Sequence, residues 1–505
     1  MPRSARDGVP CANFKCEKTH KCEKILLFLL QFSAMWFYHI WIPIFVVAQI
    51  LHLFVSLVMI YFLTRKVNWV DTSEAEDIPE EELPFIVLVY PVLREDEGTM
   101  HSTLVTLSWL DYPKSRYRII AVPNSDDDHS IQALERLQAE FSFLEVVKVP
   151  PTSDPSWQVV WDAWADNPNA YWFHQGRTRE SRDLPPKKTR QLLYVFYNLV
   201  AEIGPDWVLD YIDADSMPPP NHFKSAAAGL RHYDVLQATN VAGNLLDSFS
   251  ASYHAFDHMC WDGLVYPHMS ANGKHPFYVL GKGLFYKASD LVELGCFNPW
   301  VTIEDPEIGL RLWTHGKKLG VIADPLIEEV PRTFKAGIVQ RYRWTCGFFQ
   351  ALGRPLKQMG MKLRHRIRAR LNLVPVLSLP LNVVSVPTGI LAMLIFVVRG
   401  HNPFPIWAVW LSFVNLVLYL LIVGVIHVSA FRRTKLVLEN VGSRLWFSLR
   451  VNPLFMFFYY LLWTVPVTIG FWMFLADRGK AWARTPKFDA DRKFASGGRE
   501  NWPAR

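Results

Sequence analysis

Charged residues are almost absent from four stretches of the chain, and these stretches lie toward its two ends. The first runs from Ile25 to Leu63, where only His39 and His52 interrupt the apolar pattern. Because a bilayer crossing takes about 20 residues, this stretch predicts one long membrane helix or two tightly connected ones. It is too long for a signal peptide and has no small-residue cleavage site. The other three are Leu371 to Val398, Pro405 to Phe431 and Pro453 to Ala476.

Prolines and basic residues refine this picture. Pro375, Pro380 and Pro387 predict either a kinked helix or an interfacial segment that leads into a span. The positive-inside rule favours the cytoplasm for the middle of the chain and for the loop 432–450. A basic N-terminus prefers the same side, so two N-terminal spans are predicted. The basic residues at these boundaries and in the loop are Arg65, Lys66, Arg364, Arg366, Arg368, Arg370, Arg432, Arg433, Lys435, Arg444 and Arg450.

The middle of the chain has a different pattern, typical of a soluble α/β domain. Phe85 to Tyr90, Arg118 to Val122 and Trp207 to Ile212 are short apolar runs typical of buried parallel strands. His129 to Phe141 has helical spacing. Strands that alternate with helices predict a doubly wound sheet, with ligands at the C-terminal ends of the strands.

We therefore predict five parts. They are a cytoplasmic segment 1–24, membrane helices 25–64, an α/β domain 80–361, interfacial and membrane helices 362–476, and a polar tail 477–505.

Composition agrees with this mixture. Of 505 residues, 50% are hydrophobic and 20% charged, which excludes disorder, collagen and a small disulfide scaffold. The net charge of +6 is too small to indicate a nucleic-acid partner. Cys11, Cys16 and Cys22 cluster before the first span. A zinc site there would need a fourth ligand, and lipidation of Cys22 and free thiols in a reducing compartment are the alternatives.

The strongest local signal for chemistry is Asp213-Ala-Asp215, which directly follows the apolar run ending at Ile212. Two carboxylates at a strand end can share a divalent cation. Hard Mg²⁺ or Mn²⁺ prefers such oxygen ligands and leaves room for substrate phosphates. The alternative is a loop with two solvated aspartates.

A second acidic pair, Glu304-Asp305, precedes Pro306, a residue typical of the first position of a helix. A carboxylate at this point can act as a general base. The alternative is an acidic N-cap, which the helix dipole favours. Glu307, in the first turn, interacts favourably with the dipole and needs no catalytic role.

A third motif, Gln340-Arg-Tyr-Arg-Trp344, stands just before the basic approach to the membrane. Arginine can neutralise a pyrophosphate, and tryptophan offers a flat face to the CH groups of a sugar. The alternative is a basic amphipathic helix on the membrane surface, which fits Arg364 to Arg370 better.

Together these motifs resemble the membrane-embedded family 2 glycosyltransferases, the relatives of cellulose synthase, hyaluronan synthase, chitin synthase and ceramide glucosyltransferase. The family pattern has spaced aspartates, a T-E-D triplet and Q-x-x-R-W. The matching residues are Asp213, Asp215, Glu304, Asp305, Gln340, Arg343 and Trp344, and Ile303 takes the threonine place of T-E-D. Gly281 to Lys287 is similar to the glycine-rich acceptor-side strand of the family, and Leu294 to Phe297 to its V-G-G-F turn. The resemblance runs from about Pro84 to the tail and implies a GT-A-type, Rossmann-like domain flanked by transmembrane helices.

The nucleotide end departs from the family pattern. The family opens with P-x-x-N-E; Pro91 and Glu95 fit this pattern, but Arg94 takes the asparagine place. Where the family has D-D-G-S, this chain has Ser125-Asp-Asp-Asp128, so Asp126 or Asp127 is predicted to contact the uridine.

The segment Lys187 to Leu192 resembles the K-x-x-A-L-N helix of the family. Lys188 and Arg190 are therefore predicted to reach the nucleotide phosphates. A solvated basic loop over 177–188 is the alternative.

The resemblance implies an inverting transfer of a sugar from a UDP-sugar donor. Asp213 and Asp215 would bind Mg²⁺ or Mn²⁺ and the donor phosphates, and the metal would offset charge on the leaving diphosphate. Asp305, beside Glu304, would deprotonate the acceptor hydroxyl. The Q-x-x-R-W residues would hold the acceptor end and the leaving diphosphate.

Q-x-x-R-W often accompanies repeated addition, so we predict a processive polysaccharide synthase whose spans line an export path. The alternative is a single addition to a membrane lipid. A transporter or receptor would need charges inside the spans, where almost none are present. A catalytically inactive binding module would not need both Asp215 and Asp305. The sugar, the linkage, accessory subunits, and the choice between bacterial cell membrane and eukaryotic Golgi or plasma membrane stay open.

The tail carries a basic-aromatic segment with Trp482, Arg484 and Lys487. It resembles the W-x-K-T segment of many family members and, more loosely, cytoplasmic gating loops that cover the donor. The alternative is a juxtamembrane anchor. With two N-terminal spans, a cytoplasmic tail needs an even number of later spans. One of the three later stretches must then be interfacial, re-entrant or split; Leu371 to Val398 and Pro453 to Ala476 are the candidates.

Overall fold

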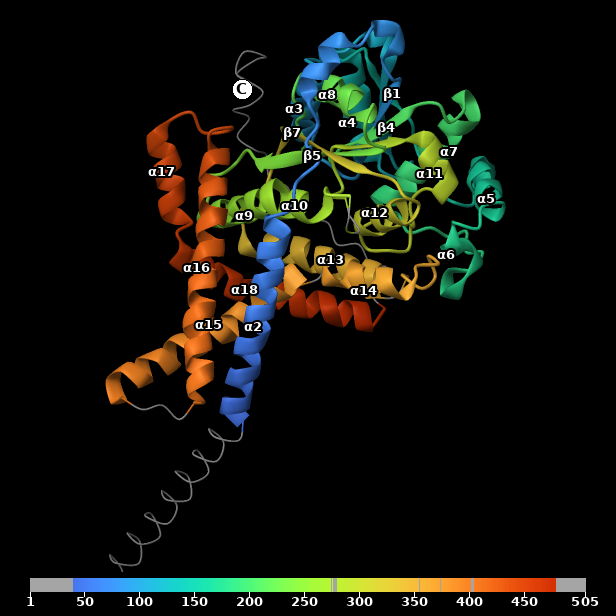
Figure 1. Cartoon of the computed structure of the whole chain (residues 1–505). Helices are drawn as coiled ribbons and strands as arrows, with labels where there is room; N and C mark the ends of the chain where they lie inside the picture. The colour runs from blue at the N-terminus through green and yellow to red at the C-terminus, as the bar shows by residue number, and fades with distance from the viewer. Residues whose placement is uncertain are drawn as a thin grey trace, which may run out of the picture. The chain divides into compact units, whose positions relative to one another are not determined.

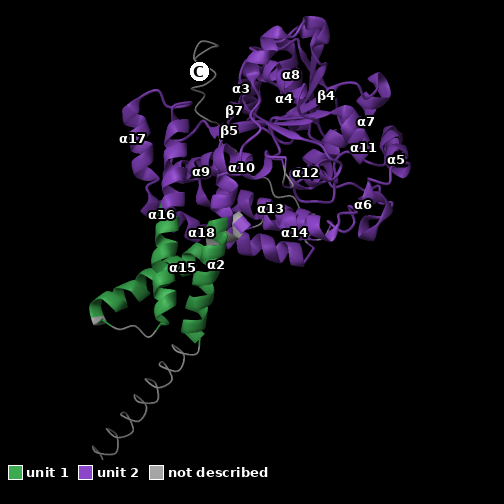
Figure 2. Ribbon diagram, viewed as in Figure 1, with its two compact units in different colours: residues 1–57, 381–420 green, residues 58–380, 421–505 purple. Residues whose placement is uncertain are grey.

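The computed structural model (Figure 1) describes residues 40–477, except 274, 276–278, 354, 373 and 401–403. The chain divides into two compact units, coloured separately in Figure 2. The apolar-helix unit comprises Met1–Leu57 and Leu381–Leu420, and the α/β unit comprises Val58–Pro380 and Leu421–Arg505.

A seven-stranded mixed sheet forms the core of the α/β unit, in the order β3-β2-β1-β4-β6-β5-β7. Neighbouring strands are parallel except around β6, which is antiparallel to both β4 and β5. The strands are β1 (Ile86–Val92), β2 (Tyr117–Pro123), β3 (Leu144–Val146), β4 (Val208–Tyr211), β5 (Val235–Ala242), β6 (Leu284–Lys287) and β7 (Leu319–Glu328).

Helices connect these strands and cover the sheet, and other helices of the unit follow the last strand, β7 (Figure 1). Within the α/β unit they are α3 (Glu97–Leu107), α4 (Asp128–Glu140), α5 (Gln158–Ala165), α6 (Tyr171–His174), α7 (Lys188–Ile203), α8 (His222–Leu230), α9 (Phe249–Cys260), α10 (Tyr266–Ser270), α11 (Ala288–Leu294), α12 (Asp305–Thr314), α13 (Phe334–Gly353), α14 (Leu363–Leu371), α17 (Val441–Arg450) and α18 (Pro453–Leu475). Three more, α2 (Ile42–Leu63), α15 (Val374–Arg399) and α16 (Ile406–Thr434), cross the division between the units.

The α/β class predicted from the sequence is confirmed. The three predicted apolar runs form β1, β2 and β4, and the predicted helix is α4. The sheet is mixed, however, because β6 runs against its neighbours. An apolar run indicates that a strand is buried but carries no information on its direction.

The two faces of the sheet bury alternate side chains, as the twofold repeat of a strand requires. Val87 and Val89 of β1 face a cluster that includes residues of α5, α7 and α12. Ile86 and Leu88 face a second cluster with residues of α3, α4 and α8. Because both faces are covered, the strands read as continuous apolar runs in the sequence.

Helix α18 packs along α13 within the α/β unit (Figure 1). The closest approach is at Gly470, where an added Cβ would lie 2.7 Å from the carbonyl oxygen of Tyr342. Further along, the ring of Phe349 contacts Phe471 and Phe474. An apolar helix is therefore in direct contact with the helix that carries Q-x-x-R-W.

In the apolar-helix unit, polar side chains connect α2, α15 and α16. Gln49 donates to the carbonyl oxygen of Ser385 (2.8 Å), and Asn415 donates to the side-chain oxygen of Gln49 (2.9 Å). Between apolar helices such bonds contribute packing specificity where water offers no competition.

Four described helices are long and apolar enough to cross a bilayer, which fits a membrane protein: α2, residues Leu381–Val398 of α15, α16 and α18. Pro375, Pro380 and Pro387 all lie inside the single helix α15. The predicted first span has one described helix, which begins at Ile42, and the residues before 40 lie outside the described part. Trp482, Arg484, Lys487 and the three N-terminal cysteines also lie outside it.

Candidate active site

The Asp213-Ala-Asp215 turn follows directly after β4. The carbonyl oxygen of Ala214 accepts hydrogen bonds from the hydroxyls of Tyr90 (2.7 Å) and Thr103 (2.9 Å). A backbone pairing of Met217 with Ile327 fastens the other end of the turn to β7. These bonds place both aspartates at the edge of the sheet, where they line a cavity of about 270 Å³.

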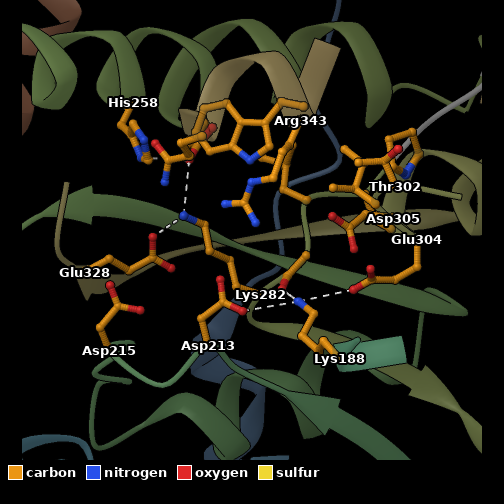
Figure 3. Close-up of a pocket in the computed structure, with 18 of the residues that line it drawn as sticks. Lys188, Asp213, Asp215, His258, Lys282, Thr302, Glu304, Asp305, Glu328 and Arg343 are labelled. Atoms are coloured by element: carbon orange, nitrogen blue, oxygen red, sulfur yellow. Dashed lines mark hydrogen bonds and ion pairs between the residues drawn. The ribbon is translucent and has the colours of Figure 1, made fainter. Parts of the chain in front are cut away.

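Lys188 lies at the start of α7 and bridges two acidic segments that are distant in sequence (Figure 3). Its ammonium is 3.2 Å from Asp213 Oδ1 and 3.1 Å from Glu304 Oε1, and it donates to the carbonyl oxygen of Gly281 (2.9 Å). Burial alone would lower the pKa of Lys188, but the charges of Asp213, Glu304 and Asp305 raise it above its ordinary value. Lys188 is therefore a permanent cation within the cavity.

Asp305 is the first residue of α12 and faces the same cavity. The hydroxyl of Tyr211 donates to its Oδ1 (3.1 Å). Burial and the neighbouring charge of Glu304 raise its pKa well above the usual range. Gly281 leaves room for this carboxylate, because an added Cβ would lie 2.5 Å from Asp305 Oδ2 and would displace it.

The alternative of a simple acidic cap fits the helix start poorly. Glu304 is the N-cap residue of α12, yet its side chain makes no capping hydrogen bond; its carboxylate contacts Lys188 instead. Glu307 in the first turn forms a buried ion pair with Arg311 (2.8 Å) and is absent from the cavity lining. The helix start thus directs two carboxylates into the cavity.

Gln340, Arg343 and Trp344 lie on α13 at helical spacing, so all three face the cavity. Burial lowers the pKa of Arg343. The ring of Trp344 packs against His258 at a centroid distance of 5.5 Å. The same helix holds the acidic loop, because the side chain of Gln350 accepts a hydrogen bond from the backbone N–H of Thr302 (2.7 Å).

Arg341, between these residues, is buried and is not itself in the cavity lining, but it contacts side chains that are. It forms an ion pair with Asp257 of α9 (2.8 Å), and both side chains are 2% exposed. Its guanidinium also lies over the ring of Trp463 in α18, 5.0 Å from the centroid. The ion pair fastens α13 to α9 and the ring contact fastens it to α18; the sequence indicated neither.

Only some of the residues that were predicted to bind the nucleotide line the cavity. Pro91 and Glu95 line the cavity, whereas Asp126, Asp127 and Arg190 are not in its lining. Asp127 caps α4 by accepting from the backbone N–H of Ser130, and its other oxygen accepts from the N–H of Arg94 (2.6 Å). Arg190 donates to the side-chain oxygen of Asn124 (2.7 Å).

Arg94 itself has a left-handed backbone, with φ of 52°. Asparagine tolerates this region better than most residues. The conformation therefore explains why an asparagine suits this position in the P-x-x-N-E pattern. The carboxylate of Asp127 stabilises this conformation by accepting a hydrogen bond from the backbone N–H of Arg94.

Further titratable side chains line the cavity without a role predicted from the sequence, among them His258, Asp262, Lys282 and Glu328. Asp262 is in a π-helical segment, Trp261–Val265, a geometry that often marks functional positions. Burial raises the pKa of Asp262 to about 6 and that of Glu328 to about 7. The only sequence signal for this group is a lysine between two glycines, Gly281-Lys282-Gly283.

Comparison with known proteins gives a consistent picture. The family model described as "Glycosyl transferase family group 2" matches residues 207–475. A protein of Sulfolobus acidocaldarius described as a "Probable glycosyltransferase" is 22% identical over 423 residues, which cover 82% of this chain and 79% of that protein. Glucomannan 4-beta-mannosyltransferase 7 of Arabidopsis thaliana is 27% identical over 152 residues, 27% of this chain and 26% of that protein.

Among solved structures, a mannosyltransferase from Pyrobaculum calidifontis in complex with GDP-Man and Mn²⁺ shares 15% sequence identity. The alignment covers 85% of this chain and 99% of that one, with a TM-score of 0.47.

Proposed function

This chain belongs to glycosyl transferase family group 2, and on that premise we propose that its cavity transfers a sugar from a nucleotide diphosphate to an acceptor hydroxyl with inversion. The observation that carries the proposal is the convergence of three motifs on one cavity. Asp213 and Asp215, Asp305, and the Q-x-x-R-W residues all line it, although they come from three separate parts of the chain.

Asp305 is the general base in this proposal. Its raised pKa gives its carboxylate a higher proton affinity than an ordinary aspartate, which suits proton removal from a hydroxyl. The acceptor oxygen attacks the anomeric carbon as its proton passes to Asp305, and the bond from that carbon to the donor phosphate oxygen breaks. In-line attack inverts the configuration. Tyr211 and Gly281 fix the orientation of the carboxylate.

The residues at the cavity fit a divalent cation. Asp213 and Asp215 supply hard oxygen ligands. Within the described residues, the lining holds nine acidic and only four basic side chains, so an anionic donor needs added positive charge. No group of three His, Cys, Asp or Glu side chains in the described residues is arranged to hold a metal alone. When bound, Mg²⁺ or Mn²⁺ would offset charge on the diphosphate, and the donor phosphates would complete its ligands.

Lys188 and Arg343 supply the fixed cations for the leaving diphosphate, and Gln340 and Trp344 hold the acceptor end. The ring of Trp344 provides a flat apolar surface against which the CH groups of a sugar pack. The nucleobase lies on the side of Pro91 and Glu95. UDP-sugars remain our first choice of donor, with Asp126 or Asp127 as the uridine contact.

A polysaccharide is the favoured acceptor. Several Arabidopsis relatives carry the name glucomannan 4-beta-mannosyltransferase, and the chain spans less than half of their length. Their name supports a growing β-linked glycan and adds mannose to the candidate sugars. Export through the spans, a cytoplasmic catalytic domain and a donor-gating role for Trp482, Arg484 and Lys487 belong to this proposal. A single addition to a membrane lipid is the alternative.

A donor screen tests the proposal. The purified chain in lipid nanodiscs is incubated with UDP-glucose, UDP-N-acetylglucosamine or GDP-mannose and Mg²⁺ or Mn²⁺, and released nucleoside diphosphate and product mass are measured. A polymer from one donor supports the synthase, and one sugar on a lipid supports the alternative. Release from no donor, with and without added lipid extract, would contradict glycosyl transfer by this chain alone.

A further inference from the structure

Lys282 is a cavity-lining cation with no role in the mechanism above. Its ammonium forms an ion pair with Glu328 and lies 3.9 Å from Asp262 Oδ2. Asp262 in turn lies 3.6 Å from His258 Nδ1. Figure 3 shows the side chain of Lys282 extended into the cavity, with Glu328 beside its ammonium and His258 above it.

The backbone around Lys282 holds this side chain in place. Gly283 has φ of +60°, and an added Cβ would lie 2.6 Å from Leu326. Gly281 lies against Asp305, and its carbonyl oxygen accepts from Lys188. The turn is therefore packed on both sides, so Lys282 is directed into the cavity before any ligand binds, which lowers the entropic cost of binding.

The surroundings of Lys282 include the donor aspartates. Glu328, its ion-pair partner, accepts from the hydroxyl of Ser216, the residue after Asp215 (3.2 Å). Asp213 itself forms an ion pair with Lys188 at 3.2 Å. Three cations from three elements, the start of α7, the turn before β6 and the middle of α13, gather around Asp213 (Figure 3).

We propose that Lys282 is a third cation for the donor diphosphate, an inference that rests on the proposed glycosyl transfer. In the free protein its ammonium is held by Glu328 and Asp262. When the donor enters, the ammonium turns to a phosphate oxygen and forms a charge-assisted hydrogen bond. Glu328 and Asp262 then act as the resting partners of the lysine, so that a buried cation is never left without a counter-charge.

Binding of nucleotides that differ by one phosphate tests this assignment. The full chain in nanodiscs, with Mg²⁺ present, is titrated calorimetrically with UDP and UMP and with GDP and GMP. The readout is the ratio of the monophosphate Kd to the diphosphate Kd for the base that binds. A merely structural lysine would weaken both nucleotides together and leave this ratio unchanged. We expect Lys282→Met to lower the ratio by about 10- to 100-fold, the usual effect of losing a hydrogen bond to a charged group.

A second variant separates direct contact from simple neutralisation of Glu328. In the double variant Lys282→Met with Glu328→Gln, both charges are absent. We expect the ratio to stay low, because the phosphate contact is still missing. A ratio that returns to the wild-type value would show that Lys282 only neutralises Glu328 and would overturn the assignment. An unchanged ratio in Lys282→Met would overturn it too. If wild-type protein binds neither UDP nor GDP, the proposed function fails and this inference fails with it.

Discussion

Lys188 and Lys282 each contact two carboxylates in the same cavity, yet they belong to different kinds of local structure. Lys188 starts a 16-residue helix and contacts Asp213 and Glu304. Lys282 stands in a turn between two glycines and contacts Glu328 and Asp262. The Lys188 cluster (Lys188, Asp213, Glu304) includes the residue before Asp305. The Lys282 cluster (Lys282, Glu328, Asp262) includes a residue of the π-helical segment, and its Glu328 contacts Ser216, which follows Asp215.

The two lysines carry the same charge, but their carboxylate partners differ in the role that we propose for them. Lys188 contacts Asp213 of the proposed metal site and Glu304, which immediately precedes the proposed base. The carboxylates around Lys282 have no such role and hold a cation in place. Removing the base beside Glu304 should therefore cost catalysis, whereas removing a carboxylate near Lys282 should mainly alter binding.

The largest effect is expected from Asp305→Asn. Loss of a general base lowers kcat by about 10²–10⁴-fold, while the affinity for nucleoside diphosphate should survive. Glu328→Gln is the matched variant from the Lys282 cluster, and its kcat should fall by less than about 10-fold. Both are measured by nucleoside diphosphate release with saturating donor. Near wild-type turnover in Asp305→Asn would show that Asp305 is not the base.

The second largest effect is expected from the buried ion pair between Arg341 and Asp257. Arg341→Met leaves Asp257 buried without its cation, which should destabilise the protein by about 3–5 kcal/mol. Thermal unfolding in detergent should show a clear drop in Tm. Adding Asp257→Asn should recover part of the loss, because no uncompensated charge then remains. If the single and the double variant melt at the wild-type temperature, the ion pair does not hold α13 in position.

Asp215→Ala should abolish metal-dependent donor binding. Outer-shell partners of a metal typically contribute 10–100-fold to affinity, so removal of a direct ligand should cost at least about 100-fold. Donor affinity is measured with increasing Mn²⁺, and the exposed Asp166→Asn serves as control. Full activity of the wild-type protein in a strong chelator would contradict metal use by both aspartates.

The smallest effect is a shift in pH dependence. A general base works only without its proton, and burial together with Glu304 raises the pKa of Asp305. As the pH falls through this raised pKa, Asp305 becomes protonated and kcat/KM should drop tenfold per pH unit. The acidic limb should therefore lie above the ordinary aspartate range. A profile that stays flat down to that range would contradict the raised pKa of the base.

Much of the site could be predicted from local sequence because its motifs are short. Asp213 and Asp215 follow an apolar run that forms β4, so their place at a strand end could be anticipated. Gln340, Arg343 and Trp344 share a helix face through their spacing alone. Asp127 shows the limit of this reasoning, since the sequence predicted only a uridine contact and did not indicate that this residue caps α4 and binds the N–H of Arg94.

The amino-acid sequence by itself determined the buried strands, the apolar helices and the three motifs, because hydrophobic periodicity and short-range spacing act between neighbouring residues. Only the tertiary structure decided that β6 runs antiparallel, that Lys188 joins Asp213 to Glu304, that Arg341 pairs with Asp257, and that Lys282 pairs with Glu328 and Asp262. These contacts link residues dozens of positions apart. Their energies depend on which groups are buried together, and no local pattern in the chain records that.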